Sequence, residues 1–275
     1  MNTIKSLGLV GLAATALIAT QAFATTCPIN NVGQQTMGSP TCIAPYGQDG
    51  AGTGLQDELN AITTSGPDIN VYTGQYQPSS FWSIGASGGS ENKILLEIAG
   101  NANKNTFGIF DPTNPNNYLQ LFSGPASAGW STLLSQTGNT YTATYFNGSD
   151  VYQGQSSITI NGNLFGYYLS GPGGTFYSDP SMNETGGTVY PNGMPHMVTY
   201  AGTGQTYLNG KKFLSGEYLL AWEDSAWGKS DLDYQDFVVL VESVHSVPEP
   251  AVLGMFGLGV LLIGGLAALR RRQVA

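Results

Sequence analysis

The stretch Thr140-Tyr-Thr-Ala-Thr-Tyr-Phe146 carries the clearest structural pattern in this chain of 275 residues. Threonines alternate with aromatic or apolar side chains along its length. Because side chains of a β-strand point to opposite faces of a sheet in turn, the alternation predicts a strand with one buried and one solvated face. Such half-buried strands are typical of antiparallel sheets.

Other short runs share the enrichment in aromatic and β-branched residues, and Gly, Pro, Asn or Asp bounds each of them. We predict strands at residues 70–76, 93–99, 106–110, 118–122, 141–146, 156–160, 164–169, 197–200, 217–223 and 236–242. Asn161-Gly162 is the strongest hairpin signal, and Asn147-Gly148 and Asn209-Gly210 are similar. The pattern predicts an all-β domain at residues 67–246, an antiparallel β-sandwich or jelly-roll-like fold.

The composition favours a secreted β protein. Charged residues make up 10% of the chain, 38 residues are glycine, and the formal net charge is −9; ordinary soluble domains have about 25% charged residues. All arginines lie at the C-terminal end, and no basic cluster precedes them. Nucleic-acid binding needs clustered Lys or Arg, so we exclude it.

The C-terminal tail has three parts in order. Val247-Pro248-Glu249-Pro250 leads into an uncharged apolar run at residues 251–269, which ends at Arg270-Arg271-Arg272. As a helix the run would span ~28 Å, close to the hydrocarbon thickness of a bilayer. We predict one transmembrane helix with its basic end in the cytoplasm and the preceding chain outside.

This tail, residues 247–275, closely resembles the PEP-CTERM sorting signal of Gram-negative bacteria. The resemblance implies recognition by an exosortase, cleavage near Pro248 to Pro250, and delivery to the cell surface or its polysaccharide matrix. The alternative is a plain membrane anchor with a coincidental Pro-Glu-Pro.

The N-terminal end, residues 1–24, is predicted to be a signal peptide. Lys5 supplies the positive charge, residues 7–18 are apolar, and Ala22-Phe23-Ala24 has the small residues that a signal peptidase reads. We place the cleavage between Ala24 and Thr25.

Two cysteines, Cys27 and Cys42, lie in a segment at residues 25–66 that is predicted to be irregular apart from one short helix at 56–62. In an oxidising periplasm we expect them to form a disulfide.

Most of the acidic side chains near the end of the domain fall on one predicted loop. These are Glu223, Asp224, Asp231, Asp233 and Asp236, between the strands at 217–223 and 236–242. Crowded carboxylates repel one another unless a cation or N–H groups compensate, and Ca²⁺ takes six to eight such oxygens. A calcium site and a set of turn-capping Asp residues are both compatible with this pattern.

Here the chain resembles a second family, a domain of unknown function in secreted bacterial proteins. The resemblance rests on Trp222-Glu-Asp224, Asp231-Leu-Asp-Tyr-Gln-Asp236, Phe107-Gly-Ile-Phe-Asp111 and Leu164-Phe-Gly-Tyr-Tyr-Leu169. It implies a β-sandwich and a cation site at Glu223, Asp224, Asp231, Asp233 and Asp236, with no established activity. Trp227 and Lys229 stand where glycines are more usual in that family.

Enzyme motifs do not fit their required context. Gly85-Ala-Ser-Gly-Gly89 matches the pattern of serine hydrolases, but polar loop residues flank it where a strand and a helix are needed. His196 and His245 are the only histidines, and no zinc or P-loop spacing occurs. We predict a protein that is not an enzyme.

Together these features predict an exported protein, first anchored in the inner membrane and then sorted to the surface or matrix. Signal peptidase and exosortase would process it, and its role would be structural or adhesive in the exopolysaccharide layer. The alternative is a carbohydrate-binding module with an aromatic site, for which Trp82, Trp130, Trp222, Trp227 and the tyrosines are candidates, although aromatic residues of sandwiches usually lie in the core.

Overall fold

The computed structural model describes residues 41–44, 53–77, 80–97, 102–187 and 189–247. It contains one α-helix, α1 (Leu55–Ile62), and two short 3-10 helices, η1 (Ala102–Lys104) and η2 (Pro180–Met182), within these residues. The strands are β1 (Thr63–Ser65), β2 (Phe81–Ile84), β3 (Gly89–Glu97), β4 (Thr106–Asp111), β5 (Asn114–Phe122), β6 (Ser131–Thr137), β7 (Thr140–Phe146), β8 (Tyr152–Thr159), β9 (Gly166–Gly171), β10 (Gly174–Tyr177), β11 (Met197–Ala201), β12 (Tyr207–Leu208), β13 (Lys211–Lys212), β14 (Glu217–Trp222), β15 (Phe237–Glu242) and β16 (Val244–Val247).

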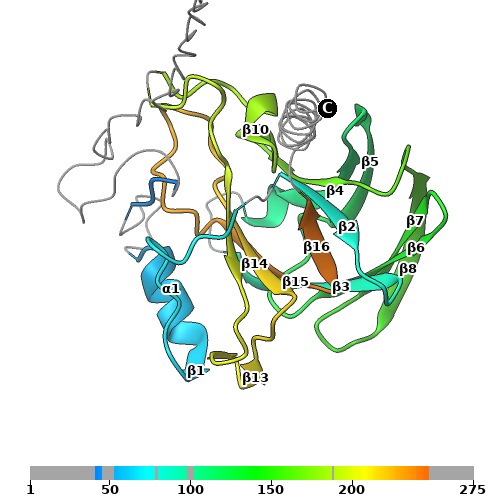
Figure 1. The fold of residues 1–275 in the computed structure, drawn as a ribbon, viewed down its shortest axis with the longest axis horizontal. Coiled ribbons are helices and arrows are strands. Elements are labelled where there is room, and N and C mark those ends of the chain that lie inside the picture. The colour runs from blue at the N-terminus through cyan, green and yellow to red at the C-terminus, as the bar shows by residue number, and fades with distance from the viewer. Residues whose placement is uncertain (1–40, 45–52, 78–79, 98–101, 188, 248–275) are drawn as a thin grey trace, which may run out of the picture.

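Two antiparallel sheets make up most of the domain (Figure 1). The larger sheet has seven strands in the order β11-β14-β15-β3-β6-β7-β8, and the smaller has four in the order β10-β9-β4-β5. Strands β1, β12 and β13 form a third sheet, and β16 pairs with β2. The prediction of an all-β domain with antiparallel sheets is confirmed for the described residues.

The main core lies between the two large sheets. Buried side chains from both sheets share one cluster, among them Phe107, Ile109, Leu121, Tyr167 and Leu169 from the smaller sheet and Ile94, Leu134, Tyr141, Ala143, Trp222 and Val239 from the larger. In β7 the alternation read from the sequence is confirmed, because Tyr141 and Ala143 are buried while Thr140 is exposed. This packing explains why hydrophobic and polar residues alternate along the strand.

A second core covers the opposite face of β11, β14 and β15. Leu55 and Leu59 of α1 pack there with Leu219, Ala221 and other residues of the sheet. Figure 1 shows α1 beside β14, with β4 and β5 on the far side of the large sheet. With both faces covered, residues 218–222 of β14 are all buried, so the strand has a continuous apolar sequence.

The short helix predicted at residues 56–62 is confirmed as α1. The segment around it contributes to the second core, because Cys42 and Ile43 are buried there beside Leu55. The N-terminal part of the described chain is therefore a packed layer over the sheet.

Two predicted features are wrong. Residues 70–76 form turns and one isolated bridge, Gln75 to Tyr200, because the Asn70 side chain accepts hydrogen bonds from the Tyr72 and Thr73 N–H groups, each 3.0 Å away. Asn161-Gly162 does not close a hairpin, because β8 and β9 on either side of it belong to different sheets.

The other two turn predictions are confirmed. Asn147-Gly148 lies between β7 and β8, which pair with each other. Asn209-Gly210 joins β12 to β13, and both residues have positive φ, 48° and 77°, as a tight hairpin turn requires. Strands β1, β2, β6, β10, β12, β13 and β16 were not predicted.

Several predicted features lie outside the described residues. These are the signal peptide at 1–24 with its Ala24–Thr25 cleavage site, Cys27, the apolar run at 251–269, and Pro248, Glu249, Pro250, Arg270, Arg271 and Arg272. In the part of the chain that the structure describes, no helix is long and apolar enough to cross a membrane. Cys42 is disulfide-bonded, and its pairing with Cys27 stays a prediction.

Candidate functional site: a buried carboxylate cluster

The register of β14 and β15 brings the two ends of the acidic loop together. Trp222 and Phe237 are cross-strand partners at the end of this antiparallel pair. Glu223 follows the first and Asp236 precedes the second, so the two carboxylates leave the sheet side by side.

All five predicted residues gather in this loop, in two groups that share Glu223. One group is Glu223, Asp231 and Asp233, and the other is Glu223, Asp224 and Asp236; within each group one oxygen per residue lies within 4.8 Å of the others. Glu223 is only 1% exposed, Asp224, Asp233 and Asp236 are also buried, and Asp231 is half-buried. The structure thus brings the five predicted side chains together, and the binding of an ion by them stays a prediction.

The backbone of the loop explains how the carboxylates converge. Leu232 and Tyr234 both have positive φ, 61° and 58°, a conformation that costs bulky residues on the order of 1–3 kcal/mol. Their side chains enter the second core. The alternating Asp231 and Asp233 side chains are thereby left to face Glu223.

Backbone N–H groups compensate part of the negative charge. Leu232 and Ser225 donate to the Glu223 carboxylate at 3.1 and 3.3 Å, and Asp224 donates to Asp236 Oδ2 at 2.8 Å. The Gln235 N–H donates to Asp233 Oδ1 at 3.2 Å, a local turn bond. The turn-capping role considered from the sequence thus accounts for some of these oxygens.

Burial, together with repulsion between the carboxylates, raises the pKa values of Glu223 and Asp236 strongly. Burial raises the pKa of Glu223 well above its usual range, and the charges of Asp236 and Asp231 add to this. The pKa of Asp236 is raised to about 8, mainly by burial and to a smaller extent by the negative charge of Asp224. Every charged neighbour that raises these two pKa values is another carboxylate, so the folded loop needs either protons or a cation near neutral pH.

Three residues that the sequence did not indicate support the loop from elsewhere in the chain. The Asn105 amide donates to Asp224 Oδ2 at 2.8 Å. His196 lies with Nδ1 3.1 Å from the Glu223 carbonyl oxygen and Nε2 3.0 Å from Glu184 Oε1. Glu184 also accepts a hydrogen bond from the Trp227 N–H at 2.8 Å. No spacing in the sequence links these residues to the loop.

His196 is packed in the interior of the domain. Its ring stacks on Phe176 with centroids 3.8 Å apart. Burial lowers its pKa, although Glu184 opposes this shift. His196 therefore acts as a buried bridge between β11 and the start of the acidic loop.

Other predicted candidates lie away from this cluster. Ser87 is in the turn between β2 and β3, where its hydroxyl donates to the Gly89 carbonyl at 2.8 Å. Trp82 and Trp222 are fully buried in the main core, so neither can stack on a ligand at the surface. Trp130 and Trp227 are half-buried.

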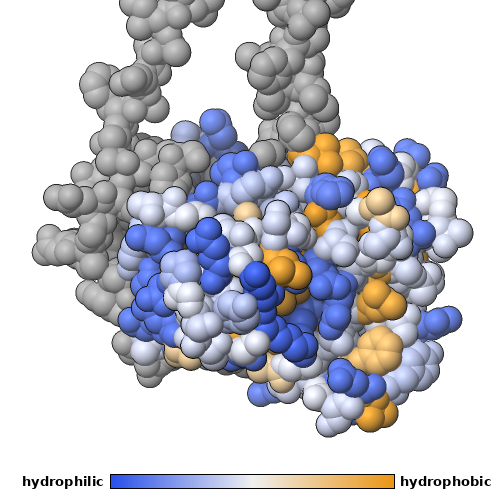
Figure 2. All heavy atoms as spheres, turned by 60° about the horizontal axis from the view of Figure 1, so that its bottom comes forward, coloured by the Kyte–Doolittle hydropathy of each residue, from blue (hydrophilic) through white to orange (hydrophobic). Residues whose placement is uncertain are grey.

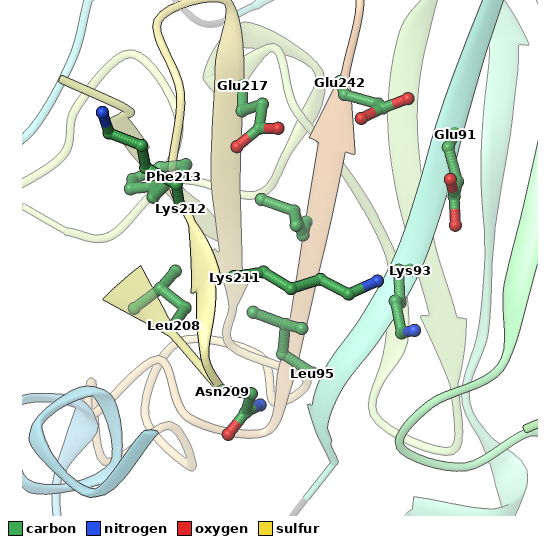
Figure 3. A pocket seen from close by; sticks show the side chains of 11 residues that line it. Glu91, Lys93, Leu95, Leu208, Asn209, Lys211, Lys212, Phe213, Glu217 and Glu242 are labelled. Carbon is green, nitrogen blue, oxygen red and sulfur yellow. The ribbon is translucent and has the colours of Figure 1, made fainter. Parts of the chain in front are cut away.

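A hollow of about 280 Å³ with apolar and charged lining residues lies against β3, β14 and β15, beside the β12–β13 hairpin (Figure 3). Figure 3 shows the side chains of Lys93 and Lys211 directed into the same part of it. Its lining also includes Leu95, Leu208, Leu240 and Phe213 together with Lys212, Glu91, Glu217 and Glu242. With three lysines and three glutamates, this hollow selects neither anions nor cations by net charge.

The face of the molecule in Figure 2 is mostly hydrophilic, with separate hydrophobic side chains between polar ones. It offers no broad apolar surface of the kind that marks an obligate protein interface.

Comparison with known proteins identifies the tail. Residues 246–272 match the family model described as the PEP-CTERM protein-sorting motif. The predicted PEP-CTERM sorting motif is therefore confirmed, and the match spans the Val247–Pro250 and Arg270–Arg272 segments. It indicates an exported, membrane-associated precursor that an exosortase processes and sorts to the cell surface. No curated protein and no solved structure matches the chain, so the resemblance of the ectodomain to a family of unknown function has no support from a homologue.

Proposed function

We propose that the chain is a non-enzymatic surface protein with a structural or adhesive role in the extracellular polysaccharide layer. The observation that carries the proposal is the position of the sorting motif. The match begins at residue 246, and the last strand, β16, ends at Val247. Since β16 pairs with β2 over its whole length, the last described strand ends within the first two residues of the motif.

We expect the described strands to keep their pairing when the tail is removed. Cleavage near Pro248 to Pro250 leaves the pairs Val247–Phe81 and Ser246–Trp82 in place. A sparsely charged surface with a net acidic balance suits a neutral, hydrated matrix better than a nucleic acid or an anionic partner.

Sorting is tested by replacing Pro248, Glu249 and Pro250 with alanine in the native host. We expect the altered chain to accumulate in the membrane fraction, while the unchanged chain reaches the surface. The control is the unchanged chain in cells without the exosortase, which should also accumulate in the membrane. Normal surface delivery of the altered chain would contradict the proposal.

We propose further that Ca²⁺ binds the carboxylate cluster and stiffens the β14–β15 loop. Oxygens within 4.8 Å of one another can contact one ion at the Ca²⁺–oxygen distance of about 2.3–2.6 Å. The ion would replace the protons that Glu223 and Asp236 otherwise need. Glu223, which belongs to both groups, would be its central ligand.

The calcium proposal is tested by thermal unfolding of the full-length chain in Ca²⁺ and in chelator. Because an ion that binds only the folded state stabilises it by mass action, about 2.7 kcal/mol at 100 times Kd, Ca²⁺ should raise Tm. Asp231→Asn with Asp233→Asn should abolish the response. Asp68→Asn with Asp150→Asn removes the same charge from exposed positions and should keep it. Equal responses in the two double variants would mean that the assigned ligands are wrong.

A further inference from the structure

The outward face of the four-stranded sheet carries an aromatic and polar surface that the functions above do not use. Along β4, β5 and β9 the residues Phe107, Ile109, Leu119, Leu121, Tyr167 and Leu169 point into the main core. Because side chains alternate along a strand, their neighbours point away from it. These neighbours include Tyr118, Gln120, Tyr168 and Ser170.

The strand register places a tyrosine beside a glycine on this face. Tyr168 of β9 is the direct partner of Gly108 on β4. A Cβ atom at Gly108 would lie 2.7 Å from Tyr168 Cε1, so the tyrosine ring occupies the space above the glycine. Tyr168 is therefore only 4% exposed, and its ring is fixed by packing against the sheet.

Tyr118 packs against Tyr168 and is the most exposed large hydrophobic residue of the described chain, at 60%. Its ring meets that of Tyr168 edge to face, with centroids 5.5 Å apart and an angle of 71°. Tyr177, the partner of Tyr168 on β10, is half-buried on the other side. The support from Tyr168 limits the positions that the exposed Tyr118 ring can take.

A hollow of about 260 Å³ runs over these rings, and every residue of its lining is uncharged. Besides the tyrosines, the lining consists of Thr106, Pro115, Asn116, Gln120, Ser170 and Thr175. Hydroxyl and amide groups can both donate and accept hydrogen bonds. In a chain of net charge −9, a charge-free hollow of this kind is complementary to an uncharged, hydroxyl-rich ligand.

We propose that this hollow binds the sugar units of a neutral polysaccharide. The C–H face of a pyranose ring would pack on Tyr118, where the electron-rich ring face attracts the positively polarised hydrogens. Gln120, Ser170 and Thr175 would bond to the sugar hydroxyls. The proposal rests on the adhesive role proposed above and names its ligand class.

The lining argues against other occupants. An anionic polysaccharide needs cations, and the hollow has none. A protein partner uses a broad, well-packed apolar centre, whereas here one exposed tyrosine stands among hydroxyl and amide groups. Self-association through this face is the remaining outcome, and the experiment distinguishes it.

The experiment measures retardation of the full-length chain in native gels that contain dextran, laminarin or galactomannan, with alginate as the charged comparison. A polyoxyethylene detergent keeps the tail soluble without adding sugar. We expect saturable retardation by at least one neutral polymer, and Tyr118→Ala should weaken it at least tenfold. Tyr118→Phe should retain binding, because the ring remains. Gln120→Ala should weaken it by a smaller factor.

The matched control is Tyr152→Ala, since Tyr152 on β8 is similarly exposed, at 57%, and is not part of the hollow. It should bind as the unchanged chain does. The site is wrong if no neutral polymer binds, if only alginate binds, or if the two alanine variants lose binding equally. A Tyr118-dependent change of oligomeric state without polymer binding would assign the face to self-association and overturn the proposal. Surface delivery in the host, measured separately, reports on the sorting proposal alone.

Discussion

Raising the pH of the calcium-free chain should destabilise the domain. The size of this loss of stability follows from the raised pKa values in the carboxylate cluster. Burial and the charge of Asp224 raise the pKa of Asp236 from 3.8 to about 8. The folded chain therefore holds a proton that the unfolded chain has already released. This contribution to stability is complete below the unfolded value and is lost as the pH rises through the folded value.

The magnitude is large for one side chain. At about 1.36 kcal/mol for each pH unit between 3.8 and 8, Asp236 alone accounts for a loss on the order of 5 kcal/mol. The whole stability of a typical domain is about 5–15 kcal/mol. Glu223, whose pKa is also raised by burial, acts in the same direction.

The assay is thermal unfolding of the full-length chain at several pH values from 5 to 9, with chelator and with Ca²⁺. Between pH 5 and 8 the loss is about 4 kcal/mol at 1.36 kcal/mol per pH unit. At about 2–4 °C per kcal/mol, Tm in chelator should therefore fall on the order of 8–16 °C across this range. In Ca²⁺ the profile should be much flatter, because the ion replaces the protons. Asp236→Asn should flatten the profile in chelator, and Asp68→Asn, at an exposed position, should not.

Two results would refute the reasoning. A flat Tm profile in chelator would mean that the buried carboxylates carry no extra protons. The same steep fall with and without Ca²⁺ would mean that the cluster titrates without binding the ion.

Three further changes test the packing around the site and the core. His196→Ala removes the buried bridge to Glu223 and should cost about 2–4 kcal/mol of unfolding free energy, seen as a lower midpoint in urea; an unchanged midpoint would show that the bridge is dispensable. Gly173→Ala would bring a Cβ atom to 2.0 Å from the Asp224 carbonyl oxygen, so it should weaken the calcium response of Tm, whereas an unaltered response would show that the loop can move aside. Leu134→Ala should destabilise the main core by about 2–5 kcal/mol with the calcium response intact; loss of that response would show that core and site are coupled.

The sequence predicted strands best where each face of a strand has one environment. β7 has a core face and a solvated face, and its alternation matches the structure. The strand predicted at residues 236–242 was found as β15 for a different reason, since its apolar run is covered by cores on both faces.

Predictions failed where side-chain hydrogen bonds competed with strand formation, or where the structure depended on which sheet the strand after a turn joins. At residues 70–76 the Asn70 side chain accepts hydrogen bonds from backbone N–H groups that would pair with another strand in a sheet. Asn161-Gly162 predicts a turn, but the turn residues do not determine whether the next strand pairs with the preceding one or joins the other sheet. The partner of each strand is set by long-range packing.

The same limit applies to the carboxylate site. Its five acidic residues could be grouped from the sequence because they lie on one loop between paired strands. Asn105, Glu184 and His196 reach the site from distant segments, and only the fold brings them together. The hollow beside Tyr118 and Tyr168 could not be predicted from the sequence either, because it depends on the pairing of Gly108 on β4 with Tyr168 on β9.

The mass of the form at the cell surface tests the central claim most directly. Intact mass spectrometry of the surface protein should give a chain that ends between Val247 and Pro250 and lacks Ala251 to Ala275, allowing for any group attached at the new end. A surface form that retains the apolar run and Arg270 to Arg272 would contradict the account.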